Sequence, residues 1–447
     1  MKQPVIQSQS SAARVSVLVT SLTFFALFSE GYDMGVLGAV LPTMLSDPSW
    51  HLAPGVAGLI ASAVLVGMFF GGYIFGVVGD RFGRKPTFLA CLTLFSAASG
   101  LAALAPNPAV FAVLRGLAGI GIGGVVPLAA ALTYEYAPPG RQSRQFALMY
   151  TGYSLGIFAS ALISFLLVRE HGWRIVVGIG LVPLLVVPLA AWLLPESLSY
   201  LVCSKQVQRA EVLAKKLGLA VPVEVDLGAS KVSPGLRALF ARDKLAATIG
   251  FWLCTFFAMI LVYGLNTWLP QIMRNAGYDL GPSIMFLGAF ALASSLGGGL
   301  LGMAADRFGR VPVIITGYIC GAFAIAMLSH VWPLPVTYIL TAVAGVGSVA
   351  VSTIMTGYLA HFFPPELRST AVGICVSFSR FGAMSGPLIG GFIAEYKLPF
   401  EWNFVVFSVA AVAAALSILI VPRREAISSL SGRTVSVHQS RLDKAIS

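Results

Sequence analysis

The sequence predicts an all-α membrane protein with twelve transmembrane helices, arranged as two pseudo-symmetric halves of six. Three observations support this prediction: an apolar composition, twelve long hydrophobic stretches and an internal repeat. Of the 447 residues, 57% are hydrophobic and only 11% are charged, and the mean hydropathy is +0.85. The core of a water-soluble protein cannot bury this much apolar surface, so the composition indicates a chain that lies in a lipid bilayer.

Each of the twelve stretches is long enough to cross a hydrocarbon core of roughly 30 Å. The first contains two acids and lacks a small-residue cleavage site, so we expect a retained helix and not a signal peptide. The stretches cover residues 15–42, 55–79, 87–105, 109–134, 146–168, 175–195, 246–270, 283–305, 313–332, 335–360, 370–394 and 402–421.

The chain repeats itself at an offset of 226 residues. "GVVGDRFGRKP" at 76–86 returns as "GMAADRFGRVP" at 302–312, and a proline pair and a glycine further along share the same offset. The repeat predicts a first half at 1–195, a connector at 196–245 with a helical segment, a second half at 246–421 and a tail at 422–447. Parallel halves of this kind imply a site between them that is opened to each side in turn by rocking.

The basic residues are distributed unevenly between the two faces that these spans define. The chain has 29 lysines and arginines and a net charge of +11. Two arginines fall inside spans, and the face opposite the N-terminus has only Arg169, Arg174, Arg274 and Lys397. The positive-inside rule therefore predicts that the connector and both termini are cytoplasmic. The net charge then reflects topology and contact with anionic lipid, and we expect no nucleic-acid partner.

Several motifs resemble those of a known family. "GxxxDRxGRK" at 76–85, its imperfect copy in the second half, and "RxxxGxGxG" at 115–123 are similar to signatures of the major facilitator superfamily. Within that family, "EGYDMGVLGAVLP", "YGLNTWLPQIMRNAGYDLG" and "SRFGAMSGPLIGG" resemble segments of the bacterial aromatic acid:proton symporters. Those proteins import benzoate, gentisate, hydroxybenzoates or hydroxyphenylpropionate.

The resemblance implies the twelve-helix fold of that superfamily in a bacterial cytoplasmic membrane. It further implies a proton-coupled symporter that imports a small monocyclic aromatic carboxylate by alternating access, driven by the proton gradient without a cofactor. The expected partners are the acid anion, protons and the lipid bilayer, and we expect a monomer.

Helix 1 carries two acids, Glu30 and Asp33, one turn apart on one helical face. An acid near the bilayer centre costs about 2.5 to 3.5 kcal/mol on insertion scales, so it normally faces a polar cavity or a partner. We interpret both acids as proton-coupling residues. The family more often has aspartate where this chain has Glu30. The alternatives are a structural ion pair or, for Glu30, a position near the membrane interface.

Arg115 is the expected partner of Asp33. Counted from Arg14 and Glu135 at the cytoplasmic ends of their helices, both residues lie roughly 30 Å from that side at ~1.5 Å per residue. In the superfamily the matching arginine is implicated in proton coupling. The alternative is an arginine that snorkels to the outer surface.

Arg380 lies 11 residues into its span from Ser369, roughly 17 Å deep. Its planar guanidinium fits a carboxylate bidentately, so we interpret it as the substrate clamp. The alternative is an ion pair with an acid on a neighbouring helix. The repeat maps Arg380 onto Ser154, and the two acids of helix 1 onto Phe256 and Met259. This asymmetry suggests a proton-coupling first half and an anion-binding second half.

An aromatic substrate also needs flat apolar walls and a few polar partners. We rank Asn266 and Trp268 highest, because they lie in the family-like segment of helix 7. The full set of candidates is Tyr32, Tyr150, Tyr153, Tyr263, Asn266, Trp268, Tyr358 and Phe378.

The repeated Asp-Arg-x-Gly-Arg loop predicts an inner gate. Carboxylates there can pair with neighbouring bases or interact with a helix N-terminus, and so hold one conformational state. The candidate gating residues are Asp80, Arg81, Arg84, Glu135, Arg144 and Asp306.

Other functions are less well supported by the residues. "GIGIGG" at 119–124 fits GxGxxG but has no preceding strand, so it indicates helix packing and not a dinucleotide site. The five scattered cysteines have no metal-ligand spacing, and no span holds a catalytic Ser-His-Asp set, so we expect no enzyme. A drug:proton antiporter, an importer of a non-aromatic organic acid and a receptor that binds without transport remain as alternatives.

Overall fold

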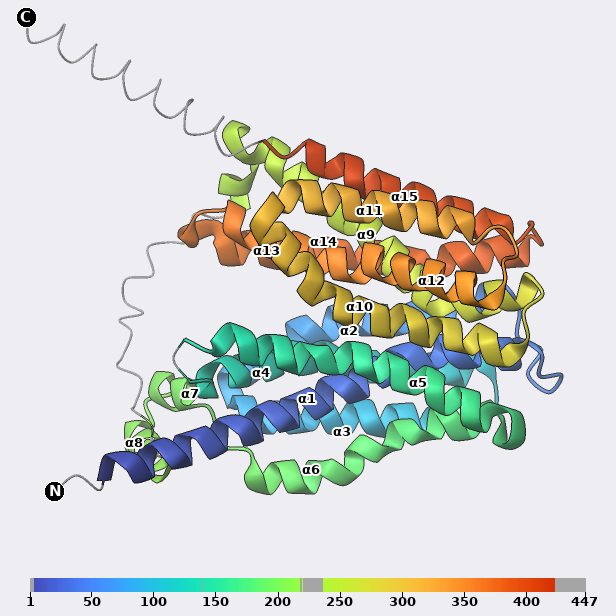
Figure 1. Cartoon of the computed structure of the whole chain (residues 1–447). Coiled ribbons are helices and arrows are strands. Elements are labelled where there is room, and N and C mark those ends of the chain that lie inside the picture. Colours follow the sequence, from blue (N-terminus) through green and yellow to red (C-terminus); the bar gives the residue numbers. More distant parts are fainter. Residues whose placement is uncertain (1–3, 139, 218, 220–235, 423–447) are drawn as a thin grey trace, which may run out of the picture.

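The fold is a bundle of long helices in two groups (Figure 1). The computed structural model describes residues 4–138, 140–217, 219 and 236–422. Nearly all of the predicted tail and part of the predicted connector therefore lie outside the described residues. Within these ranges every regular element is a helix, which confirms the prediction of an all-α protein.

Six helices form the first half, and the second half repeats this pattern after the connector. The first half consists of α1 (Pro4–Leu45), α2 (Pro54–Phe82), α3 (Arg84–Ala102), α4 (Pro108–Tyr136), α5 (Gln142–Gly178) and α6 (Val182–Leu193). The connector holds α7 (Leu198–Cys203) and α8 (Val207–Leu217). The second half consists of α9 (Arg242–Asn275), α10 (Leu280–Phe308), α11 (Arg310–Met327), α12 (Leu334–Gly345), α13 (Val351–Phe362), α14 (Pro365–Glu395) and α15 (Glu401–Leu419).

The described helices cross a membrane twelve times. Eleven stretches are long and apolar enough to span, but one of them covers 52 residues, Gln142–Leu193. At ~1.5 Å per residue that is more than twice the hydrocarbon thickness. Gly172 breaks it with φ 76° and ψ 171°, so it supplies two crossings. The α12 and α13 helices, joined by one π-helical turn (Val346–Ala350), form a single span. The prediction of twelve crossings is confirmed.

The chain turns back at Gly172 through a polar cap. Next to the break, the Trp173 indole donates to Asp47 Oδ2 at 3.0 Å, and Arg174 donates to the carbonyl oxygens of Ala103 and Ala105 at 2.9 Å. Hydrogen bonds from Ser49 and then Trp173 hold the pKa of Asp47 below its usual range. The cap joins the α1, α3 and α5 ends of the first half.

A glycine ends α2 and its repeat ends α10. Gly83 has φ 111° and Gly309 has φ 87°, a region that favours residues without a Cβ. Each is the glycine of the Asp-Arg-x-Gly-Arg loop, so the repeated motif makes the same sharp helix-to-helix turn in both halves.

Glycines also bring α2 and α4 together. A Cβ added to Gly119 would lie 2.1 Å from the carbonyl oxygen of Val64, and one added to Gly123 would lie 2.4 Å from that of Met68. The "GIGIGG" stretch therefore serves close backbone packing, as its place in a membrane helix predicts.

The two halves are joined at one end of the bundle. We call the end with α7 and α8 the connector side, where α1 begins and α15 ends (Figure 1), and the other end the far side. On the far side, Ser62 Oγ donates to the carbonyl oxygen of Met384 at 2.8 Å, and the Gly55 amide donates to Glu395 at 2.9 Å. Both bonds run from α2 to α14.

The apolar core follows the same division. The largest cluster includes Trp50 and Trp173 from the first half together with Trp268 and Phe286 from the second. A second cluster, around Phe251, is built by the second half alone. The halves are thus closed against each other on the far side.

Candidate functional site

Asp33 and Arg115 form a buried ion pair inside the first half. Arg115 Nη1 lies 2.6 Å from Asp33 Oδ1, and Arg115 Nη2 donates to the Asp33 backbone carbonyl at 3.1 Å. Ser99 Oγ of α3 donates to the same Oδ1 at 2.6 Å. Asp33 is 1% exposed and Arg115 2%, so this arginine does not snorkel to a surface. The pair joins α1, α3 and α4.

Glu30 lies one turn from Asp33 toward the connector side, and it is buried without such a pair. Its side chain belongs to a residue 3% exposed, and Oε2 has no hydrogen-bond partner among the described residues. Arg380, on α14 of the other half, is close enough for its charge to interact with Glu30. The polar contact that the structure gives the Arg380 guanidinium is a long one, 3.9 Å to Met68 Sδ, which leaves most of its donors for another group.

Three tyrosines complete this region. Tyr150 and Tyr153 of α5 lie with ring centroids 6.2 Å apart, and Tyr263 of α9 lies beside Tyr153. Tyr150 lies close enough to Glu30 and Arg380 for its hydroxyl to interact with both charges. We call Glu30, Tyr150, Tyr153, Tyr263 and Arg380 the central group. It draws side chains from α1 and α5 of the first half and from α9 and α14 of the second.

Phe378 lies two residues before Arg380 and extends an aromatic surface along α9 and α14. Its ring stacks on Trp252 with centroids 4.9 Å apart and a 21° angle, and it lies 5.8 Å from the ring of Phe256. Tyr358 packs instead against Phe251 within the second half.

The structure does not bring the remaining substrate candidates to Arg380. The Tyr32 hydroxyl donates to the Val176 carbonyl at 2.7 Å, and the Trp268 indole donates to the Pro387 carbonyl at 2.8 Å. Asn266 Nδ2 donates to the Met34 carbonyl at 2.9 Å. All three donors are buried in helix contacts, so the two residues ranked highest from the sequence serve packing in this conformation.

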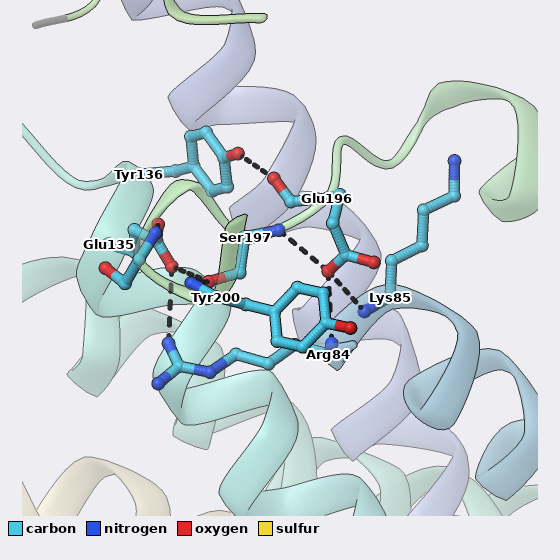
Figure 2. Close-up of polar contacts among 8 residues, drawn as sticks. Arg84, Lys85, Glu135, Tyr136, Glu196, Ser197 and Tyr200 are labelled. Atoms are coloured by element: carbon cyan, nitrogen blue, oxygen red, sulfur yellow. Dashed lines mark hydrogen bonds and ion pairs between the residues drawn. The ribbon is translucent and has the colours of Figure 1, made fainter. Parts of the chain in front are cut away.

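A polar network ties the start of the connector to the first half (Figure 2). Glu135 at the end of α4 pairs with Arg84 at 3.2 Å and accepts from Ser197 Oγ at 2.6 Å and from the Ser199 amide at 2.7 Å. The Tyr200 hydroxyl donates to the Arg81 carbonyl. Arg84 and Glu135, two predicted gating residues, are therefore in contact.

Glu196 is the other acid of this network (Figure 2). Its Oε1 accepts from the amides of Arg84 and Lys85, both at 3.0 Å. It thereby caps the α3 N-terminus, where the helix dipole favours a negative charge.

The other predicted gating residues lie outside this network. Asp80, Arg144 and Asp306 are exposed, and the part of the chain that the structure describes gives them no hydrogen bond or ion pair. These three residues are on the connector side, whereas the Ser62–Met384 and Gly55–Glu395 bonds are on the far side, so the three make no bond between the halves in this conformation.

The residues of these sites that were not predicted from the sequence include Ser99, Glu196 and Ser197. Ser197 did offer a signal, because it directly precedes α7 and its hydroxyl accepts from the Tyr200 amide as an N-cap. In the described residues no group of three or more His, Cys, Asp or Glu side chains could hold a metal ion.

The family model and two related proteins that match this chain are those of membrane transporters. The family model of the Major Facilitator Superfamily matches residues 23–299 and 251–443. The benzoate transport protein of Acinetobacter baylyi is 32% identical over 423 residues, which cover 92% of this chain and 90% of that protein. The gentisate transporter of Corynebacterium glutamicum is 31% identical, with 90% and 86% covered.

Solved structures share the fold at low identity. The xylose transporter XylE from E. coli, in a partially occluded inward open conformation, gives a TM-score of 0.70 at 17% identity, with 92% of this chain and 99% of that chain covered. A mutant of the nucleoside transporter NupG gives a TM-score of 0.71 at 14% identity, with 92% and 100% covered.

Proposed function

This chain belongs to the Major Facilitator Superfamily, in the family of aromatic acid transporters, and we propose that it is a proton-coupled symporter that imports a small monocyclic aromatic carboxylate. It is a multi-pass membrane transporter and not an enzyme. What we propose is that protons drive transport, that the substrate moves into the cell, and that Glu30 and Arg380 couple proton movement to substrate movement.

The observation that carries the proposal is the relation between Arg380 and Glu30. One is a cation with unused donors on the second half, and the other is a buried acid with an unpaired oxygen on the first half. A substrate carboxylate bound bidentately by Arg380 neutralises that cation. Burial favours the neutral form of a carboxyl, while a nearby cation favours the charged form. Binding of the anion therefore leads Glu30 to take up a proton.

The aromatic residues of the site fit the rest of such a substrate. The rings of Trp252 and Phe378 stack on each other along α9 and α14, and an aromatic substrate ring prefers offset or edge contacts with such an aromatic surface. The Tyr153 and Tyr263 hydroxyls offer hydrogen bonds to ring hydroxyl groups. The Asp33–Arg115 pair acts in this scheme as a second charged switch inside the first half; Asp33 Oδ2 and Arg115 Nε are buried without a hydrogen-bond partner among the described residues.

The direction of transport follows from the topology that we propose. The connector side carries most of the lysines and arginines of the chain, so by the positive-inside rule it faces the cytoplasm, as do both termini. The membrane is then the bacterial cytoplasmic membrane. The described conformation, closed on the far side, corresponds to the state in which the site releases its substrate inward, and rocking of the halves returns it to the outward state.

The test is uptake of radiolabelled acids into proteoliposomes with an alkaline interior. Benzoate, gentisate and 4-hydroxybenzoate should compete with each other, whereas cyclohexanecarboxylate, which has the same carboxylate on a saturated ring, should compete poorly. Vesicles without protein and vesicles with Arg380→Ala measure passive entry of the neutral acid. Uptake that an uncoupler leaves unchanged would contradict proton symport. Equal competition by the saturated acid would favour an importer of non-aromatic acids, and export of cationic drugs would favour an antiporter.

A further inference from the structure

Asn266 forms a hydrogen bond between the two halves, outside the central group proposed to bind the substrate. It is 4% exposed, and its Nδ2 on α9 donates to the Met34 carbonyl on α1, 232 positions away in the sequence. The backbones of the same two helices are in close contact one turn on, because a Cβ at Gly38 would lie 2.1 Å from the Asn266 carbonyl oxygen. The amide thus holds α1 and α9 together on the far side.

The Met34 carbonyl, which accepts from Asn266, directly follows the Asp33 carbonyl, which accepts from Arg115 of the buried ion pair. Arg115 Nη2 donates to the Asp33 carbonyl at 3.1 Å from α4, while Asn266 donates to the Met34 carbonyl at 2.9 Å from α9. Two consecutive carbonyls of α1 are therefore held from opposite halves of the protein. A shift of Arg115 relative to Asp33 would therefore act on α1 directly beside the carbonyl that Asn266 binds.

The remaining polar atom of the amide suggests a contact that can be broken and remade. Asn266 Oδ1 is buried without a hydrogen-bond partner among the described residues. An unpaired buried acceptor is unfavourable, and it partly offsets the bond made by Nδ2. The amide therefore stabilises the contact by less than a fully satisfied side chain would.

We propose that Asn266 is a positioning residue that ties the Asp33–Arg115 pair to closure of the far side. In this role it acts through α1 and not through the substrate. The inference deepens the proposed function, since it names the element by which the charged pair of the first half influences the rocking of the halves.

The test measures distances on both sides of the protein by pulsed electron spin resonance in lipid nanodiscs. Spin labels at Ser46 and Asn275 report the far side, and labels at Ser143 and Phe308 report the connector side; all four positions are exposed. The exposed Cys203 and Cys320 are first replaced by serine. No substrate or proton gradient is present, so failure of the proposed function does not affect the result.

Asn266→Leu keeps the size of the side chain and removes the donor. Loss of one net hydrogen bond should shift the ratio of far-side-open to far-side-closed molecules by about fivefold. The far-side distance should lengthen and the connector-side distance should shorten in the same fraction of molecules, which general loosening would not produce. Thr255→Val is the control, because its buried hydroxyl donates to the Phe251 and Trp252 carbonyls within α9 itself. It should leave the two populations unchanged.

A double-mutant comparison tests the link to Asp33. Asp33→Asn should also open the far side, and in the Asn266→Leu background it should add less than twofold. Ser62→Ala removes another bond between the halves that does not touch the ion pair, so its effect should add fully to that of Asp33→Asn. Unchanged distances in Asn266→Leu and Asn266→Ala, or full additivity with Asp33→Asn, would overturn the proposal. So would loss of folded protein in both Asn266 variants while Thr255→Val folds, because Asn266 would then serve the fold alone.

Discussion

Replacing Arg115 by methionine isolates a buried charge whose environment the structure defines closely. Asp33 is 1% exposed, and the substitution removes both bonds from Arg115 while leaving the one from Ser99. Breaking a buried pair from one side typically costs about 3 to 5 kcal/mol. If the aspartate takes up a proton instead, the free-energy cost at pH 7 is about 4 kcal/mol from its ordinary titration range. Both routes predict a loss of about 4 kcal/mol in the free energy of unfolding.

The double variant Asp33→Asn/Arg115→Met should recover most of this loss, because neither charge is then left alone in the interior. Thermal unfolding of the purified variants is followed by tryptophan fluorescence. The melting temperature of the double variant should lie below that of the wild type and above that of each single variant. Uptake should be lost in all three. A double variant that melts at or below the less stable single variant would refute the reasoning, since the two side chains would then contribute independently.

Three further predictions concern other contacts. Arg380→Ala should weaken binding of benzoate by at least tenfold in calorimetry, with Arg380→Lys in between, because a charge-assisted bond is worth about 1.5 to 3 kcal/mol; unchanged binding excludes the clamp. Glu135→Ala should lower unfolding stability by about 2 kcal/mol, since Arg84 and Ser197 lose their acceptor, whereas Asp80→Ala, at an exposed site, should leave the melting temperature within error. Gly119→Ala should destabilise by about 1 to 3 kcal/mol through its 2.1 Å contact with α2, and an unchanged melting temperature would show that α2 and α4 separate freely.

The sequence predicted the parts of this protein that depend on periodicity and depth. Twelve apolar stretches and a 226-residue repeat were enough for the fold, because a bilayer sets the length of each span. Counting residues along two helices also put Asp33 and Arg115 at the same height, and the structure joins them at 2.6 Å. A position along a helix axis can be obtained from the sequence because the rise per residue is fixed.

The sequence did not show which way each side chain faces around its helix. It also did not show which group on a neighbouring helix that side chain binds. Asn266 and Trp268 lie in the segment most like the family, but their donors bind backbone carbonyls, and no side-chain pattern marks a carbonyl as an acceptor. Glu196 reaches the α3 N-terminus 112 residues earlier in the chain, which no local signal encodes. Glu30, where the family more often has aspartate, is the acid of helix 1 to which the structure gives no ion pair.

Net uptake and exchange by Glu30→Gln test the central claim most directly, because they separate substrate binding from proton coupling. Both are measured with radiolabelled benzoate in proteoliposomes, with the rate in Arg380→Ala vesicles subtracted as passive entry. The account predicts that Glu30→Gln retains exchange of external for internal benzoate but no longer responds to an imposed pH gradient. Gradient-driven uptake at the wild-type rate in Glu30→Gln would contradict it, because Glu30 would then have no part in moving the proton.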